Sequence, residues 1–113
     1  MPAKNQTYLI SFEGVSTAEA GSHATELRQV LLDSSEDVSV EIVRHDDSSQ
    51  NFGDVLQVVL AAPAAVIAAR ALRDWLRMRH SASIEIRTIE GHLVAKNITS
   101  KDAASLVDKL QRY

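Results

Sequence analysis

The 113-residue sequence contains no cysteine, and its four glycines are scattered along the chain. The absence of cysteine excludes a disulfide framework, a thiolate metal site and a cysteine nucleophile. The scattered glycines exclude the glycine-rich loop that cradles nucleotide phosphates, and the Gly-x-Ser-x-Gly elbow of many hydrolases is missing. The sequence therefore lacks the common motifs of nucleotide-binding and hydrolytic enzymes, and we expect a non-enzymatic protein without a cofactor.

Long apolar runs are also absent. The longest stretch without a charged residue covers residues 55–69 and contains Gln57 and Pro63, whereas a membrane-spanning helix needs about 20 predominantly apolar residues. Residues 1–10 hold no apolar run long enough for a signal peptide. We expect no membrane span, no export and a cytoplasmic location.

The chain has little that could hold a metal ion. None of its four histidines belongs to an HExxH or HxH pattern. The nearest group of hard ligands is His45-Asp46-Asp47, in a polar segment that is typical of a solvated acidic turn. We expect no bound metal.

Charge is distributed unevenly. Residues 1–54 hold ten acids and three bases (−7), and residues 55–113 hold five acids and nine bases (+4), which gives the net charge of −3. Such asymmetry is typical of a protein that binds a polar partner or that associates head to tail with its own copies. Two helices whose solvent-exposed faces carry opposite charges would also produce it. The main basic cluster contains Arg70, Arg73, Arg77, Arg79 and His80.

This cluster does not predict a nucleic-acid site, because the chain is net acidic and only 4% aromatic. A solvated helix face is the preferred interpretation, and an acidic protein partner is the alternative.

The first half of the sequence predicts a strand, a helix and a second strand. Apolar residues alternate within Thr7–Glu13 and again within Val38–Ile42. Between them, Ser16 and Glu19 form a capping box that begins a helix, with Ser22 as the alternative start because Gly21 disfavours a helix interior. A helical connection predicts a right-handed crossover between parallel strands. The expected buried face of the helix consists of Ala20, Ala24, Leu27 and Leu31.

The second half predicts a long helix, a hairpin and a last helix. Residues 55–79 are interpreted as a helix that Pro63 kinks or divides, and a strand at Val55–Leu60 is the alternative. Residues 84–88 and 92–98 form a hairpin around a two-residue Glu90-Gly91 turn, and Thr99 or Ser100 begins a helix that extends to Arg112. The apolar stripe of the long helix contains Leu56, Leu60, Ala64, Ile67, Ala71, Trp75 and Met78.

Together these elements predict one α+β domain over residues 1–113, in the order β-α-β-α-β-β-α. Its four-stranded mixed sheet has helices on one face, because all four strands alternate rather than being apolar throughout. Residues 1–6 are predicted to be disordered, and residues 44–54 to form a polar loop.

Several segments in this order resemble the effector-associated constant component family of bacteria. They are the run from Gly53 to Leu60 with the alanine-rich stretch after it, the Trp75-Leu76-Arg77 end of the long helix, the Ile84-Glu85-Ile86 strand, the Glu90-Gly91 turn and the closing segment 102–110. The resemblance implies a small non-enzymatic component encoded beside effector proteins, such as protease-like domains, in bacterial conflict or regulated cell-death systems. It implies no catalytic residue.

The long helix is apolar nearly all round, which predicts an interface. Trp75 is interpreted as a core or interface anchor, and Phe52, in the loop, as an anchor or a partner contact. We expect either an effector protein or a second copy of the chain to cover the 55–79 helix. The candidate interface residues are Val58, Val66, Arg70, Arg73, Arg77 and Phe52.

The alternative function is a small-ligand-binding or regulatory domain that uses the open face of the sheet. A ligand site requires a concave apolar pocket with a few convergent polar groups, whereas an interaction component requires an exposed apolar patch.

Overall fold

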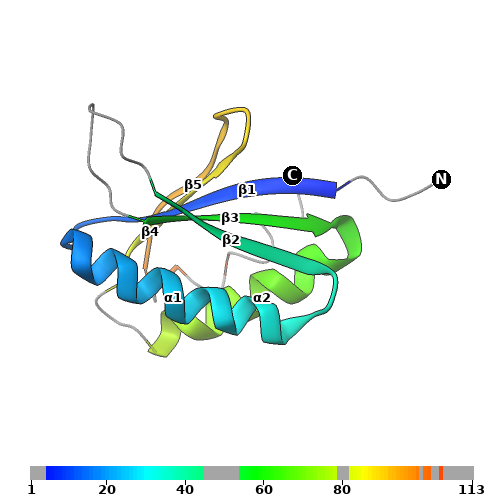
Figure 1. The fold of residues 1–113 in the computed structure, drawn as a ribbon, viewed down its shortest axis with the longest axis horizontal. Helices are drawn as coiled ribbons and strands as arrows, with labels where there is room; N and C mark the ends of the chain where they lie inside the picture. The colour runs from blue at the N-terminus through cyan, green and yellow to red at the C-terminus, as the bar shows by residue number, and fades with distance from the viewer. Residues whose placement is uncertain (1–4, 45–53, 79–81, 100, 103–104, 106–113) are drawn as a thin grey trace.

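The computed structural model describes residues 5–44, 54–78, 82–99, 101–102 and 105. In this part of the chain, five strands and two helices form two layers, with both helices on one face of the sheet (Figure 1). The elements are β1 (Asn5–Phe12), α1 (Thr17–Ser34), β2 (Val38–Arg44), β3 (Asp54–Ala61), α2 (Ala62–Met78), β4 (Ile84–Thr88) and β5 (Leu93–Ile98).

The sheet is antiparallel throughout, in the order β2-β3-β1-β4-β5. The α+β class is confirmed, but the predicted four-stranded mixed sheet is wrong in strand number and in pairing. The reason is β3, which inserts between β1 and β2 and pairs antiparallel with both. Because β1 and β2 are each antiparallel to β3, they run in the same direction, as the helical connection predicts, but they are not neighbours in the sheet.

The alternative interpretation of residues 55–60 as a strand is therefore confirmed, and the continuous helix over residues 55–79 is wrong. Valines favour a pleated strand, and β3 is a central strand whose outward face is also apolar. When nearly all residues of a short segment are apolar, the spacing of its apolar residues does not distinguish a strand from a helix. The helix begins only at Ala62, so Pro63 lies in its first turn, where a missing backbone N–H costs little.

The capping box at the start of α1 is confirmed. The Glu19 backbone N–H donates to Ser16 Oγ at 3.1 Å, and the Ser16 N–H donates to Glu19 Oε1 at 3.3 Å. Gly21 lies inside the helix, so the alternative start at Ser22 is not used. The buried residues of α1 are the predicted ones, Ala20, Ala24, Leu27 and Leu31.

The predicted β4–β5 hairpin is present, but its connection has four residues, 89–92, rather than two. The Gly91 N–H donates to the Thr88 carbonyl at 2.9 Å, and the Thr88 N–H donates to the His92 carbonyl at 2.8 Å. Gly91 has φ 98°, in the region that favours glycine.

Some predictions concern the chain ends and the loops. β1 begins at Asn5, inside the segment 1–6 that the sequence predicts to be disordered. The loop residue Phe52, the His45-Asp46-Asp47 cluster and most of the predicted last helix lie outside the described residues.

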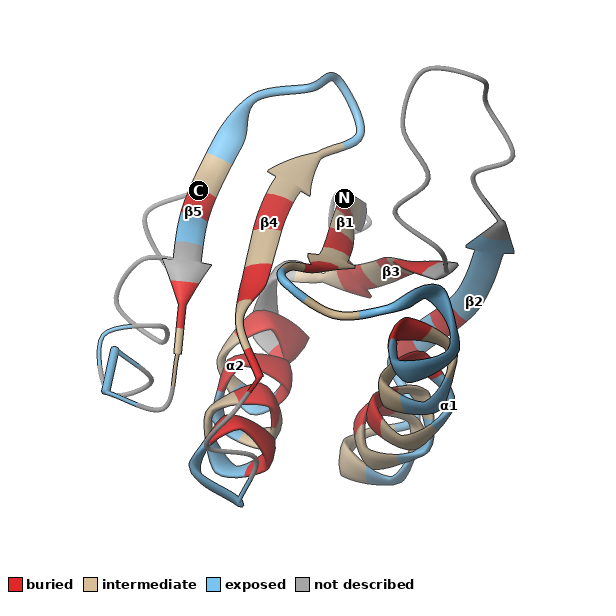
Figure 2. Ribbon diagram, turned by 90° about the vertical axis from the view of Figure 1, so that its left-hand side faces the viewer, coloured by how far each residue is buried: buried red, intermediate tan, exposed pale blue. Residues whose placement is uncertain are grey.

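The core lies between the two helices and the inner face of the sheet (Figure 2). Strands β1 to β4 contribute alternate residues to it, whereas β5 contributes Ala95 and Ile98, three positions apart across an irregularity in its register. The described residues include no buried polar or charged side chain. The largest fully buried side chains are Leu27, Leu31, Leu56, Leu76, Ile84, Ile86 and Ile98.

Candidate interaction surface on the helical layer

The outer side of α2 exposes large apolar side chains. Ile67 is 43% exposed and Met78 is 80% exposed, although both belong to the stripe that the sequence predicts to be buried. In the sequence-based prediction, that stripe was counted from Leu56 along one continuous helix. Because Leu56 and Leu60 belong to β3, they do not define the buried side of α2. The buried side of α2 is instead formed mainly by small residues, namely Ala64, Ala65, Ala68, Ala69, Leu72, Trp75 and Leu76.

Trp75 anchors α2 to α1 and to β1. It is 4% exposed, and its ring lies edge-on to Phe12 and His23 with centroid distances of 6.0 and 5.5 Å. Its Nε1–H donates to Glu26 Oε1 of α1 at 2.7 Å, the short distance expected of a hydrogen bond to a carboxylate. The predicted role of Trp75 as an anchor is confirmed. His23 is half-buried against these rings.

A hollow of about 360 Å³ opens beside Trp75 between α1 and α2. Four of its lining side chains are apolar and two are carboxylates. Glu26 accepts the Trp75 N–H, while Asp74 accepts a hydrogen bond from Arg73 Nε at 3.2 Å and is largely exposed. The lining residues are Glu26, Val30, Ala71, Asp74, Trp75 and Met78.

Arginines flank this surface on the side away from α1. At 100° per residue, Arg70 and Arg77 lie on one side of Ile67 and Asp74, and Ala71 lies on the other side. Arg70 and Arg77 are exposed, and Arg73 is half-exposed. Across the outer surface of α2 the hollow with Met78 therefore comes first, then Ile67 and Asp74 in one line, then a basic edge.

The structure separates the predicted interface residues. Val58 lies in β3, 3% exposed in the core, so its prediction as an interface residue is wrong. Val66 is half-buried on the arginine side of α2. Sequence reasoning placed Ile67 and Met78 on the buried stripe, because that stripe was aligned with Leu56 and Leu60, which belong to β3.

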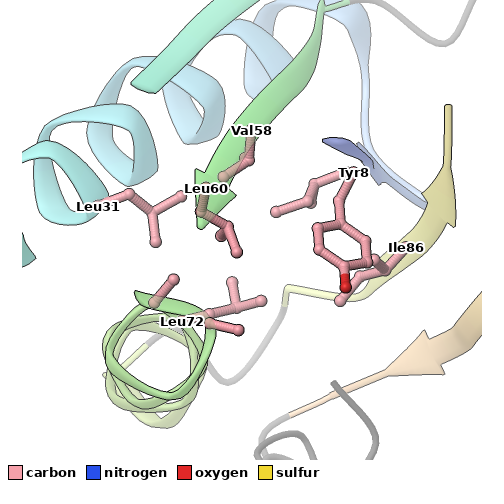
Figure 3. Close-up of a pocket in the computed structure, with 9 residues that line it drawn as sticks. Tyr8, Leu31, Val58, Leu60, Leu72 and Ile86 are labelled. Carbon is pink, nitrogen blue, oxygen red and sulfur yellow. The ribbon is translucent and has the colours of Figure 1, made fainter. Parts of the chain in front are cut away.

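A second cavity lies inside the core, between the helices and the sheet (Figure 3). It measures about 20 Å³, roughly the room of one water molecule. The Tyr8 hydroxyl donates to Gln6 Oε1, and burial raises the pKa of Tyr8. The lining is apolar, so this cavity does not have the size or the polar groups of a ligand site. Its lining residues are Tyr8, Ile10, Leu31, Val58, Leu60, Ala65, Ala68, Leu72 and Ile86.

The described part of the chain offers neither a metal-binding cluster nor a membrane-spanning helix. None of its His, Asp or Glu side chains form a group of three or more that could hold a metal ion. Neither described helix combines the length and the apolar character that crossing a bilayer requires.

The chain was compared with models of known protein families, with curated proteins and with solved structures. The family model described as Effector Associated Constant Component 1 matches residues 16–113, which include every described element except β1. No curated protein and no solved structure matches the chain significantly. The chain belongs to the Effector Associated Constant Component 1 family.

Proposed function

We propose that this chain is a non-enzymatic protein-interaction component of an effector system, and that a protein partner docks on the outer surface of α2. The observation that carries the proposal is the exposure of Ile67 and Met78 in line with the hollow beside Trp75. The family description, which associates this component with effectors, supports a protein as the partner.

The surface has the chemistry of a docking site. Large apolar side chains surrounded by charged groups are typical of protein-binding patches. The long unbranched side chain of Met78 adapts to different contact shapes. The hollow offers room for one side chain of the partner, which would contact the edge of the buried Trp75 ring.

The charges indicate how the partner would be oriented. Glu26 and Asp74 at the hollow favour a cationic group near the anchoring side chain, and Arg70 and Arg77 favour an acidic group on the other side. An amphipathic helix laid along α2 would meet both requirements.

The small-ligand alternative has less support. Its requirement was an apolar pocket with convergent polar groups, and the cavity in the core has room for about one water molecule. The exposed apolar side chains of Ile67 and Met78 on α2 support the interaction component instead.

The test is a calorimetric titration of the chain with the effector protein encoded beside it. We expect the double variant Ile67→Asp, Met78→Asp to weaken binding at least about tenfold, because losing the burial of one large apolar side chain costs about 1.5–3 kcal/mol and 1.4 kcal/mol is tenfold in Kd. Ile42→Asp is the matched control, since Ile42 is 38% exposed on β2, away from α2. Equal affinities for the wild type and the double variant would contradict the proposal.

A further inference from the structure

The face of the sheet opposite the helices has an uncharged centre. Residues that alternate with the core residues point to this outer face, and neither described helix lies on it (Figures 1 and 2). A solvated sheet face normally carries polar and charged residues. The two central strands instead present Gln57 and Val59 from β3 and Thr7, Leu9 and Ser11 from β1, all uncharged and half-buried, whereas Val55, in the same alternation, is buried.

Charges of opposite sign lie on either side of this centre. Strand pairing places one row of outward residues across the whole sheet, Glu41, Gln57, Leu9, Arg87 and Leu93. Thus β2 contributes an acid and β4 contributes a base, with two uncharged residues between them. Arg87 also pairs with Glu85 on its own strand and donates to the Gly91 carbonyl at 3.2 Å, while its side chain stays 43% exposed.

We propose that the outer face of the sheet binds a second copy of this chain, sheet against sheet. A two-fold axis parallel to the strands, between β3 and β1, would place each Glu41 over the Arg87 of the other copy and each Gln57 over the Leu9 of the other copy. Such aligned packing keeps the strand directions within about 30° of each other. The arrangement is isologous, as the commonest dimers are.

Exposed apolar side chains extend the uncharged centre toward the rim. Ile89 lies in the β4–β5 connection, where its N–H donates to the Thr7 carbonyl, and Leu93 pairs with Arg87 at the start of β5. Both are among the large exposed hydrophobic residues. In the dimer they would lie near the edge of the partner's sheet, where their burial adds to the contact of the central strands.

The available area indicates a weak dimer. Four overlapping strands about 4.8 Å apart, each about six residues long at about 3.3 Å per residue, give a footprint of roughly 380 Å² per copy. Because side chains corrugate this face, the total accessible area buried is on the order of 1,000 Å², at the lower limit for a specific interface. We therefore expect dimerisation at micromolar to millimolar concentration rather than at nanomolar concentration.

This second site is independent of the proposed docking surface, because the helices lie on the opposite face of each sheet. A dimer would carry two copies of the α2 surface and could bind a multimeric partner with a gain in avidity.

The test is sedimentation equilibrium from about 10 µM to about 1 mM, with two single variants. Gln57→Lys places a base beside Glu41 of its own sheet, and Leu9→Glu places an acid beside Arg87 of its own sheet. Both changes create favourable cross-strand pairs, so both variants should fold. Each places a charged group against an uncharged residue of the second copy, where the charge loses its hydration, so each should dimerise at least about tenfold more weakly than the wild type.

Mixing the two variants separates this geometry from a general loss of structure. In the mixture, the base introduced by Gln57→Lys in one copy would face the acid introduced by Leu9→Glu in the other. A heterodimer should therefore form at concentrations where each variant alone is monomeric. Met78→Asp, on the opposite layer, should dimerise like the wild type. A wild-type chain that stays monomeric to about 1 mM, or a mixture that forms no heterodimer, would overturn the proposal.

Discussion

Replacing Trp75 by phenylalanine tests whether the indole joins the two helices. The change removes the Nε1–H that donates to Glu26 Oε1 at 2.7 Å and leaves a void where the larger ring lay against Phe12 and His23. A hydrogen bond to a charged group contributes about 1.5–3 kcal/mol, and the smaller ring adds about 1 kcal/mol in lost packing. Trp75→Phe should therefore destabilise the fold by about 3 kcal/mol, and lower Tm by roughly 10 °C for a chain of this size.

Urea denaturation followed by far-ultraviolet circular dichroism measures this change. Glu26→Gln provides the comparison, because the amide oxygen still accepts the indole N–H and only the charge is lost. We expect Glu26→Gln to lower the free energy of unfolding by about 1 kcal/mol, which is less than half the decrease expected for Trp75→Phe. If Trp75→Phe changed the free energy of unfolding by less than about 0.5 kcal/mol, as surface substitutions do, the account of Trp75 as the link between α1 and α2 would be wrong.

Two further predictions concern the helix cap and the buried tyrosine. Ser16→Ala should lower the free energy of unfolding by about 1 kcal/mol, because Ser16 Oγ accepts a hydrogen bond from the Glu19 N–H. Thr25→Ala, at an exposed site within α1, is the control. If Ser16→Ala lowered the free energy of unfolding no more than Thr25→Ala does, the capping role of Ser16 would be contradicted. Burial raises the pKa of Tyr8 above its ordinary value of 10.0, so the unfolded chain ionises first and the free energy of unfolding should fall as pH rises through about 10 and above. The phenolate absorbance and urea midpoints of wild type and Tyr8→Phe measure this, and a wild type no more sensitive to alkaline pH than Tyr8→Phe would refute it.

Local signals in the sequence predicted most elements correctly. The Ser16–Glu19 capping box, the alternation in β2 and the glycine in the β4–β5 connection each depend on contacts within a few residues. Such contacts are visible in the sequence because neighbouring side chains determine them. These elements were found without knowledge of the sheet.

Strand order could not be predicted in the same way. Whether Val55–Leu60 is a strand depends on partners that lie about 20 and 50 residues earlier in the sequence, in β2 and β1. Treating this segment as helix removed a strand and made β1 and β2 appear to be neighbours. It also changed the phase of α2, which placed Ile67 and Met78 in the core and Val58 at the interface.

The candidate docking surface therefore became visible only with the tertiary structure. Arg70 and Arg77 were placed on the exposed side of the helix correctly, because charged residues are seldom buried. The hollow beside Trp75 requires the positions of Glu26 and Val30 on α1, which no spacing within α2 reveals.

Nuclear magnetic resonance titration of the labelled chain with a candidate effector protein tests the proposed docking surface most directly. The chain has one tryptophan and two methionines, Met1 and Met78, so the Trp75 indole N–H and the Met78 methyl signals can be assigned with single substitutions. We predict that both signals and the Ile67 methyl signal shift or broaden as the effector is added, while the Ile42 methyl signal does not change. Binding that leaves the Ile67, Trp75 and Met78 signals unchanged would contradict the assignment of the docking surface to α2.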